Sequence, residues 1–284
     1  MIPYQTGEQN KNMKFEGMLI CTDLDGTLLK KDKTISAENL NAIEYFKREG
    51  GLFTFITGRM PYFVSEVYNT VEPNVPFGCI NGGGLFNHRT QQYLWAQRMD
   101  DTVLELVKYI YDTMPDMGIQ VNTLDLIYFC RENPTMEGFR RATGVPNIER
   151  GLDEIDRPIG KIVFGDHREE RIFKLEELLR AHPLADRFDF IRSERTLFEI
   201  LPPGIHKGTA LNKLCELLSV DPKRTIAIGD YNNDIGMLRT AGVGVAVANA
   251  SPDAKAAADY ITVHHEDHAI AAVIDELDHG RLLS

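Results

Sequence analysis

The stretch that most constrains the fold is residues 18–29, MLICTDLDGTLL, where an apolar run ends in two aspartates that flank one leucine and precede Gly-Thr. Residues 18–20 predict a buried parallel strand that stops where the aspartates begin. In an open α/β sheet, side chains just past the carboxyl end of a strand line the ligand crevice. Alternation along the chain sends Asp23 and Asp25 to the same side, where two carboxylates in one small volume call for a cation. The alternative is a polar turn of Asp-Gly type, and the full motif after an apolar strand favours the site.

Other strands end in the same way. Residues 52–56 form a short apolar run that stops at Thr57-Gly58-Arg59, and residues 77–80 stop at Asn81 and three glycines. Near the other end of the chain, residues 225–228 precede GDYNND, and residues 243–247 are apolar again. Helical spacing after Ser36 and after Lys207 separates these runs, and residues 28–35 predict a short hairpin. The pattern predicts an α/β fold, a doubly wound, Rossmann-like parallel sheet.

More than a hundred residues separate Asn81 from Lys207, which is far more than a crossover needs. This segment mixes strand and helix patterns around a polar stretch at 132–157, and it predicts an inserted α+β cap domain. We expect the core at residues 1–84 and 204–284, with 1–16 a loose polar tail, and the cap at residues 85–203. Pro202, Pro203 and Gly204 make a plausible hinge between them. A substrate would occupy the cleft between the two domains.

Composition excludes several classes of partner. The net charge of −11 argues against nucleic acid and against anionic membranes, which attract basic surfaces. The four cysteines form no CxxC pair, which fits a reducing compartment. No apolar run has the length of a membrane span, and the first residues have no apolar signal-peptide region. We therefore expect a cytoplasmic protein, a monomer or a homodimer, that acts on a small molecule.

Four stretches together resemble the haloacid dehalogenase superfamily of aspartyl-phosphate phosphotransferases. They are DLDGTLL, ITGR, PPGIHKGTAL and GDYNNDIGML, and they follow the order of that family. The long insert resembles the cap of the Cof-type, or IIB, subgroup, and the similarity extends from residue 17 onward. NGG at 81–83 and VANA at 247–250 depart from the usual segments, which leaves open whether Asn81 and Asn249 contact the substrate.

The resemblance implies a role for each motif residue. Asp23 is the expected nucleophile and a Mg²⁺ ligand, and Asp25 the acid/base and, through its backbone carbonyl, a metal ligand. The other expected site residues are Asp230 as a Mg²⁺ ligand, Thr57, Gly58, Arg59, Asn81, Lys207 and Asn233 as phosphate or substrate contacts, and Asp234 as a support behind them. We expect repulsion and burial to keep one of the two aspartates charged and the other transiently protonated.

These residues predict a Mg²⁺-dependent phosphatase that hydrolyses a small phosphorylated metabolite, with sugar phosphates the leading class, through an aspartyl-phosphate intermediate. The alternatives are a phosphomutase, and a binding protein of the same fold without turnover. Arg59 could reach a substrate anion or pair with a surface carboxylate, and Lys161 in the insert could be solvated. We interpret His206 as an exposed loop residue. The cluster of His264, His265 and His268 is interpreted as a polar helix-start loop, with a metal site as the alternative.

Overall fold

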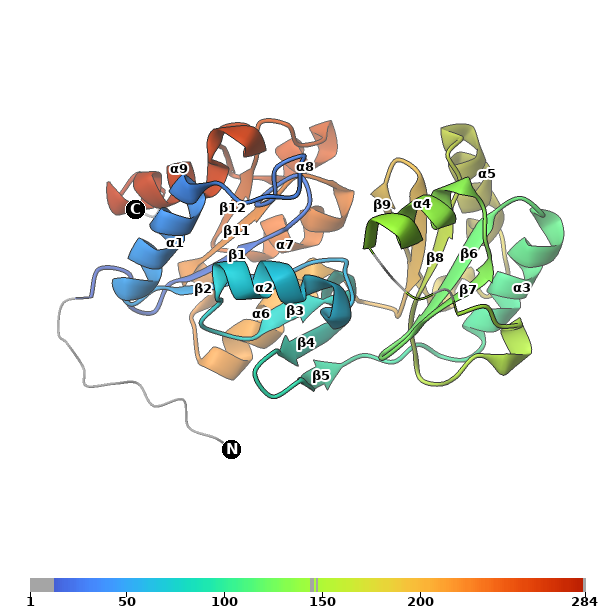
Figure 1. The fold of residues 1–284 in the computed structure, drawn as a ribbon. Coiled ribbons are helices and arrows are strands. Elements are labelled where there is room, and N and C mark those ends of the chain that lie inside the picture. Colours follow the sequence, from blue (N-terminus) through green and yellow to red (C-terminus); the bar gives the residue numbers. More distant parts are fainter. Residues whose placement is uncertain (1–12, 144–145, 147, 283–284) are drawn as a thin grey trace.

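The computed structural model describes residues 13–143, 146 and 148–282, which form two parts lying side by side (Figure 1). Most of the predicted tail, residues 1–12, lies outside the described residues. The remainder of that tail contains Phe15, which is 1% exposed and packs against Phe46 with ring centroids 4.9 Å apart. The prediction of a loose segment is therefore wrong at Phe15, because its ring fills a place in the core.

The first part is built on a parallel sheet with the strand order β13-β12-β11-β1-β2. Its strands are β1 (Leu19–Thr22), β2 (Leu52–Phe55), β11 (Thr225–Gly229), β12 (Val243–Ala246) and β13 (Tyr260–Ile261). Leu19 pairs in register with both Leu52 and Thr225, so β1 lies between β2 and β11 and all three run in the same direction. The carboxyl ends of these three strands therefore meet at one edge of the sheet, as an α/β fold requires.

Helices flank this sheet in packed pairs: α1 packs against α9, and α6 against α7. The helices of this part are α1 (Ala37–Arg48), α2 (Ser65–Val71), α6 (Lys207–Leu218), α7 (Ile235–Thr240), α8 (Pro252–Ala257) and α9 (Ala269–Asp278). The predicted cap of α1 is confirmed, since the Ser36 side chain accepts a hydrogen bond from the Asn39 backbone. The predicted hairpin at 28–35 is not a pair of strands: the chain turns there, with the Lys30 amide donating to the Thr34 carbonyl.

A small antiparallel sheet extends the first part. It contains β3 (Phe77–Cys79), β4 (Gly84–Asn87) and β5 (Gln92–Ala96) in that order, and an isolated parallel bridge from Ile56 to Gly78 links β3 to the main sheet. The predicted boundary at residue 85 assigns β5 and most of β4 to the insert. Their hydrogen bonds to β3 place them with the first part instead, because a hairpin return pairs with the strand it leaves.

The second part is an α+β unit with the strand order β7-β6-β8-β10-β9. Its elements are α3 (Val103–Thr113), β6 (Gly118–Thr123), β7 (Ile127–Arg131), α4 (Pro134–Thr143), β8 (Ile159–Gly165), α5 (Glu169–Arg180), β9 (Asp189–Glu194) and β10 (Leu197–Leu201). Helix α4 lies in the stretch at 132–157 to which we assigned no element. Ile162 and Phe164 of β8 join the apolar cluster with α3 and α5, which leaves Lys161 and Val163 on the opposite face.

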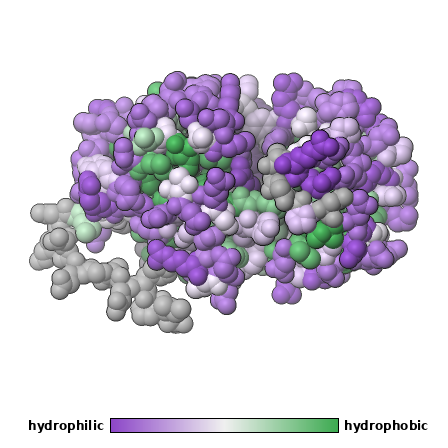
Figure 2. Space-filling model, in the orientation of Figure 1, coloured by the Kyte–Doolittle hydropathy of each residue, from purple (hydrophilic) through white to green (hydrophobic). Residues whose placement is uncertain are grey.

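The surface is mostly polar on the face seen in Figure 2, with hydrophobic residues gathered in smaller areas. Within the described ranges, no helix has the length and apolar character that crossing a bilayer demands.

Candidate active site

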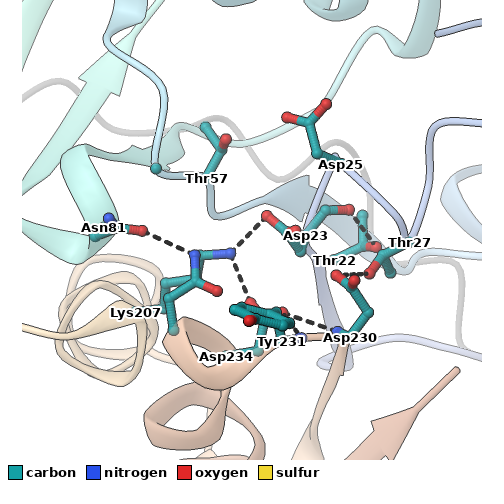
Figure 3. A network of polar contacts seen from close by, with 12 residues as sticks. Thr22, Asp23, Asp25, Thr27, Thr57, Asn81, Lys207, Asp230, Tyr231 and Asp234 are labelled. Atoms are coloured by element: carbon teal, nitrogen blue, oxygen red, sulfur yellow. Dashed lines mark hydrogen bonds and ion pairs between the residues drawn. The ribbon is translucent and has the colours of Figure 1, made fainter. Parts of the chain in front are cut away.

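The polar centre of the protein lies at the carboxyl ends of β1 and β11 and contains a lysine bound by two carboxylates (Figure 3). Lys207, the first residue of α6, is fully buried. Its Nζ lies 2.5 Å from Asp23 Oδ1 and 2.6 Å from Asp234 Oδ1. Two ion pairs at this distance, shielded from water, fix the lysine and both acids in place.

Asp234 is held from both sides. Its Oδ1 contacts Lys207, and its Oδ2 accepts hydrogen bonds from the backbone amides of Asp230 and Tyr231 at 2.8 and 3.0 Å. Both carboxylate oxygens of Asp234 therefore already have hydrogen-bond donors within the protein. Asp23 and Asp230 are therefore the carboxylates with oxygens left to bind something else.

A divalent cation fits this cluster. Oxygens of Asp23, Asp230 and Asp234 all lie within 4.8 Å of one another, with Lys207 as the cation among them. Burial raises the pKa of Asp23 well above its usual range; Lys207 opposes that rise, and the other two carboxylates add to it. Burial and the charge of Asp234 likewise raise the pKa of Asp230 to about 7. An excess of buried negative charge of this kind is what a hard, oxygen-binding metal ion neutralises.

Gly26 lets Asp230 approach the turn that follows β1. A Cβ at residue 26 would lie 2.5 Å from Asp230 Oδ2, and its φ of +79° suits glycine. Thr27 donates from Oγ1 to Asp230 Oδ1 at 3.1 Å, and Asn249 donates to the Gly26 carbonyl at 2.8 Å. The Asp-Gly-Thr sequence thus places the Asp230 carboxylate beside Asp23.

The prediction that the Asp23 and Asp25 carboxylates share one small volume is wrong. The Asp23 side chain points to Lys207, whereas that of Asp25 points away from it (Figure 3). Arg59 holds both Asp25 oxygens, with Nε at 2.9 Å and Nη2 at 2.7 Å, and Lys33 donates at 2.8 Å. Burial raises the pKa of Asp25, but these two cations outweigh it and leave the pKa below its usual range. The expectation that repulsion would favour a protonated Asp25 is therefore wrong for this state.

The remaining predicted contacts form a second group beside the first. Thr57 follows β2, is 1% exposed, and accepts a hydrogen bond from the Arg59 amide. Asn233 donates through Nδ2 to Asn81 Oδ1 at 3.1 Å. Asn81 in turn donates to Glu199 of the second part at 2.8 Å, and the Gly58 carbonyl accepts from Lys161 at 2.9 Å. Two residues of the insert thus contact two predicted site residues.

The histidines differ from the expected picture in one place. His206 is half-buried at the N-terminus of α6 rather than an exposed loop residue, and burial lowers its pKa. His265 is buried, with Nδ1 2.9 Å from the Leu29 carbonyl, while His264 Nδ1 accepts from the Glu266 amide. Their ring nitrogens thus contact backbone groups.

Sequence reasoning missed two charged residues around the site, Lys33 and Glu199, and left the role of Lys161 open. Lys161 and Glu199 are only 6% and 4% exposed, so the solvated alternative for Lys161 is wrong. The signal for both was a single charged residue within an otherwise apolar strand, which indicates that both faces of the strand are buried. Lys33 gave no comparable signal, because its position on Asp25 depends on a backbone φ of +65° in the turn.

The chain is similar to known proteins over most of its length. The family model of haloacid dehalogenase-like hydrolases matches residues 20–274. A relative from Bacillus subtilis, 5-amino-6-(5-phospho-D-ribitylamino)uracil phosphatase YitU, is 29% identical over 93% of this chain and 98% of its own. A haloacid dehalogenase-like hydrolase from Bacteroides thetaiotaomicron superposes with a TM-score of 0.78 at 26% identity, covering 92% of this chain and 99% of that one. The subclass IIB sugar phosphatase BT4131 shares the fold, with a TM-score of 0.78 at 19% identity, over 92% and 98%.

Proposed function

The chain belongs to the haloacid dehalogenase-like hydrolases and is a phosphatase of that family, and we propose that it cleaves a small sugar or polyol monophosphate through a phosphorylated Asp23. The observation that carries this proposal is the buried contact of Lys207 with Asp23 at 2.5 Å. A fixed cation beside a carboxylate keeps that carboxylate from repelling a phosphate dianion, and positions it for attack.

Each step uses a group described above. An Asp23 oxygen attacks phosphorus, and the bond from phosphorus to the leaving oxygen breaks. Asp25 gives a proton to that leaving oxygen and then takes one from the water that cleaves the acyl phosphate, which regenerates Asp23 and releases inorganic phosphate. Because Arg59 and Lys33 hold Asp25 charged, substrate entry must loosen these contacts so that Asp25 takes up a proton from solvent before it acts as an acid. Thr57, Lys207 and Asn233 would hold the phosphoryl oxygens.

We assign Mg²⁺ to the acidic cluster, held by carboxylate oxygens of Asp23 and Asp230. When bound, it would supply positive charge to the phosphoryl oxygens and offset the repulsion among the three acids. Support comes from the small number of free carboxylate oxygens, which suits an ion that retains water and phosphate as its other ligands.

The substrate class rests on the relative and on the charge of the site. YitU is named as a phosphatase of a ribitylamino compound, whose phosphate is carried by a sugar alcohol. The buried ion pair of Glu199 with Lys161 makes the insert polar at the boundary between the two parts. Neutral polyols match such a polar boundary better than apolar leaving groups do.

Phosphate release from a panel of phosphorylated metabolites with Mg²⁺ tests the proposal. Sugar and polyol monophosphates should give the highest kcat/KM, and the Asp23→Asn variant should be inactive on every one. An acyl phosphate trapped by rapid acid quench in wild type and absent from Asp23→Asn would support the covalent route. Wild-type turnover by Asp23→Asn, with deamidation excluded by mass spectrometry, would refute it.

A further inference from the structure

The insert contacts the active-site loops through a buried ion pair, Lys161 with Glu199, whose Nζ and Oε2 lie 2.9 Å apart. Both side chains belong to the insert, on β8 and β10. Glu199 pairs in register with Val163, two residues from Lys161, so the two charged residues are diagonal neighbours on one face of the sheet. That face is the one opposite α3 and α5, and it lies against the first part.

Each member of the pair also bonds to the other part of the protein. Lys161 Nζ donates to the Gly58 carbonyl at 2.9 Å, next to Thr57. Glu199 Oε2 accepts from Asn81 Nδ2 at 2.8 Å, and Asn81 Oδ1 accepts from Asn233 at 3.1 Å. Asn81 is fully buried and Asn233 is 8% exposed. A continuous chain of hydrogen bonds therefore runs from the insert to a residue expected to contact phosphate.

Direction within this chain matters, because the Asn81 amide has one end that donates and one that accepts. Glu199 has only acceptor oxygens when ionised, so it can bond only the NH₂ end. The carbonyl end is then turned to Asn233, where it accepts a hydrogen bond from Nδ2 and fixes the orientation of that second amide as well. Without an acceptor at residue 199, either end of Asn81 could face Asn233.

We propose that Glu199 is a positioning residue for phosphoryl transfer, which acts through Asn81 to orient Asn233, and that Lys161 balances its charge. The inference rests on the proposed function in one respect, the role of Asn233 at the phosphate. It assigns to the insert a part in building the phosphate site, in addition to covering the substrate.

Two charge-balanced double variants isolate the acceptor. Lys161→Met with Glu199→Gln removes both charges and keeps an oxygen that Asn81 can bond. Lys161→Met with Glu199→Met removes both charges and the acceptor. Both variants lose the hydrogen bond from Lys161 to Gly58, so its effect cancels when the two are compared. Both should fold, because well-packed apolar replacements for a buried ion pair are often neutral for stability.

We expect kcat/KM for an aryl phosphate to be about tenfold lower in the second double variant than in the first, as for the loss of one buried hydrogen bond. On an Asn81→Ala background the same pair should differ by less than about twofold, because the route through Asn81 is gone. Asp166→Asn serves as a control: it removes a buried carboxylate paired with Arg168 in the insert, and should leave kcat/KM unchanged.

Equal kcat/KM in the two double variants, or an undiminished difference on the Asn81→Ala background, would overturn the inference. If the all-methionine pair fails to fold, Asn81→Asp replaces it, since a carboxylate there removes the donor that Glu199 binds and should cause a comparable loss. Absence of turnover in the wild type on every phosphate ester would instead refute the proposed function, so the two failures are distinguishable.

Discussion

Lys207→Met is the substitution whose effect on stability follows most directly from the structure. The lysine is fully buried, and its Nζ contacts Asp23 and Asp234 at 2.5 and 2.6 Å. Removing one partner of a buried ion pair costs about 3–5 kcal/mol, because the remaining charges stay out of water without compensation. We expect a loss in this range in the free energy of unfolding at pH 8 with a chelator present. Lys213→Met on the same helix, where the lysine pairs with Glu216 near the surface, should cost under about 1 kcal/mol.

The stability lost in Lys207→Met should depend on pH and on the presence of a divalent metal ion. Without Lys207 the pKa of Asp23 rises further above its unfolded value of about 3.9. A carboxyl whose pKa is higher in the folded than in the unfolded state destabilises the fold increasingly as pH rises above the unfolded pKa. The free energy of unfolding of Lys207→Met should therefore fall below that of the wild type by less at pH 5.5 than at pH 8. A divalent cation present at about a hundredfold its Kd should restore about 2.7 kcal/mol.

Urea unfolding followed by the fluorescence of Trp95 measures this effect. Trp95 is the single tryptophan of the chain and lies half-buried in β5, within the first part of the protein. If Lys207→Met and Lys213→Met unfold at the same urea concentration at pH 8, or if the loss is greater at pH 5.5, our account of the buried charges is wrong.

Three further outcomes are expected. Chelation should abolish phosphate release and Mg²⁺ restore it, whereas Ca²⁺ should inhibit competitively because its looser geometry can take both oxygens of Asp23; equal turnover with Ca²⁺ alone would contradict this. Gly82→Ala should lower kcat/KM and stability, because its Cβ would lie 2.1 Å from the His206 carbonyl, next to Lys207, while Gly280→Ala, with nothing within 4 Å, should affect stability alone. Burial raises the pKa of Asp166, but its arginine partners outweigh this and hold it low. Asp166→Asn should therefore destabilise at pH 7, and the difference from wild type in far-UV circular dichroism melts should shrink below about pH 4; a constant difference would contradict the ion-pair account.

The sequence predicted the parallel sheet and the cluster of polar residues at its edge, because strand ends and Asp-Gly punctuation are local features. The strand β1 and the acids after it follow from one apolar run and two residues. Helix α4 escaped prediction because its stretch is polar on average, although its apolar residues recur at helical spacing. The assignment of β4 and β5 failed for a different reason: which sheet a hairpin joins is decided by its partner strand, and residues 84–96 carry no mark of that partner.

The environment of Asp25 shows where local reasoning ends. The spacing of Asp23 and Asp25 predicts two neighbouring carboxylates, and repulsion between them predicts that one is transiently protonated. The outcome depended instead on Arg59 from the loop after β2 and on Lys33 from a turn held at positive φ, two cations from separate loops. The same holds for Glu199 and Lys161: the apolar residues around each of them indicate a second buried face, but only the docking of the insert against Gly58 and Asn81 decides what that face contacts. Pairings between distant segments set the charge state of the acid and the orientation of the amides, so the chemistry of this site is tuned by contacts that no single motif contains.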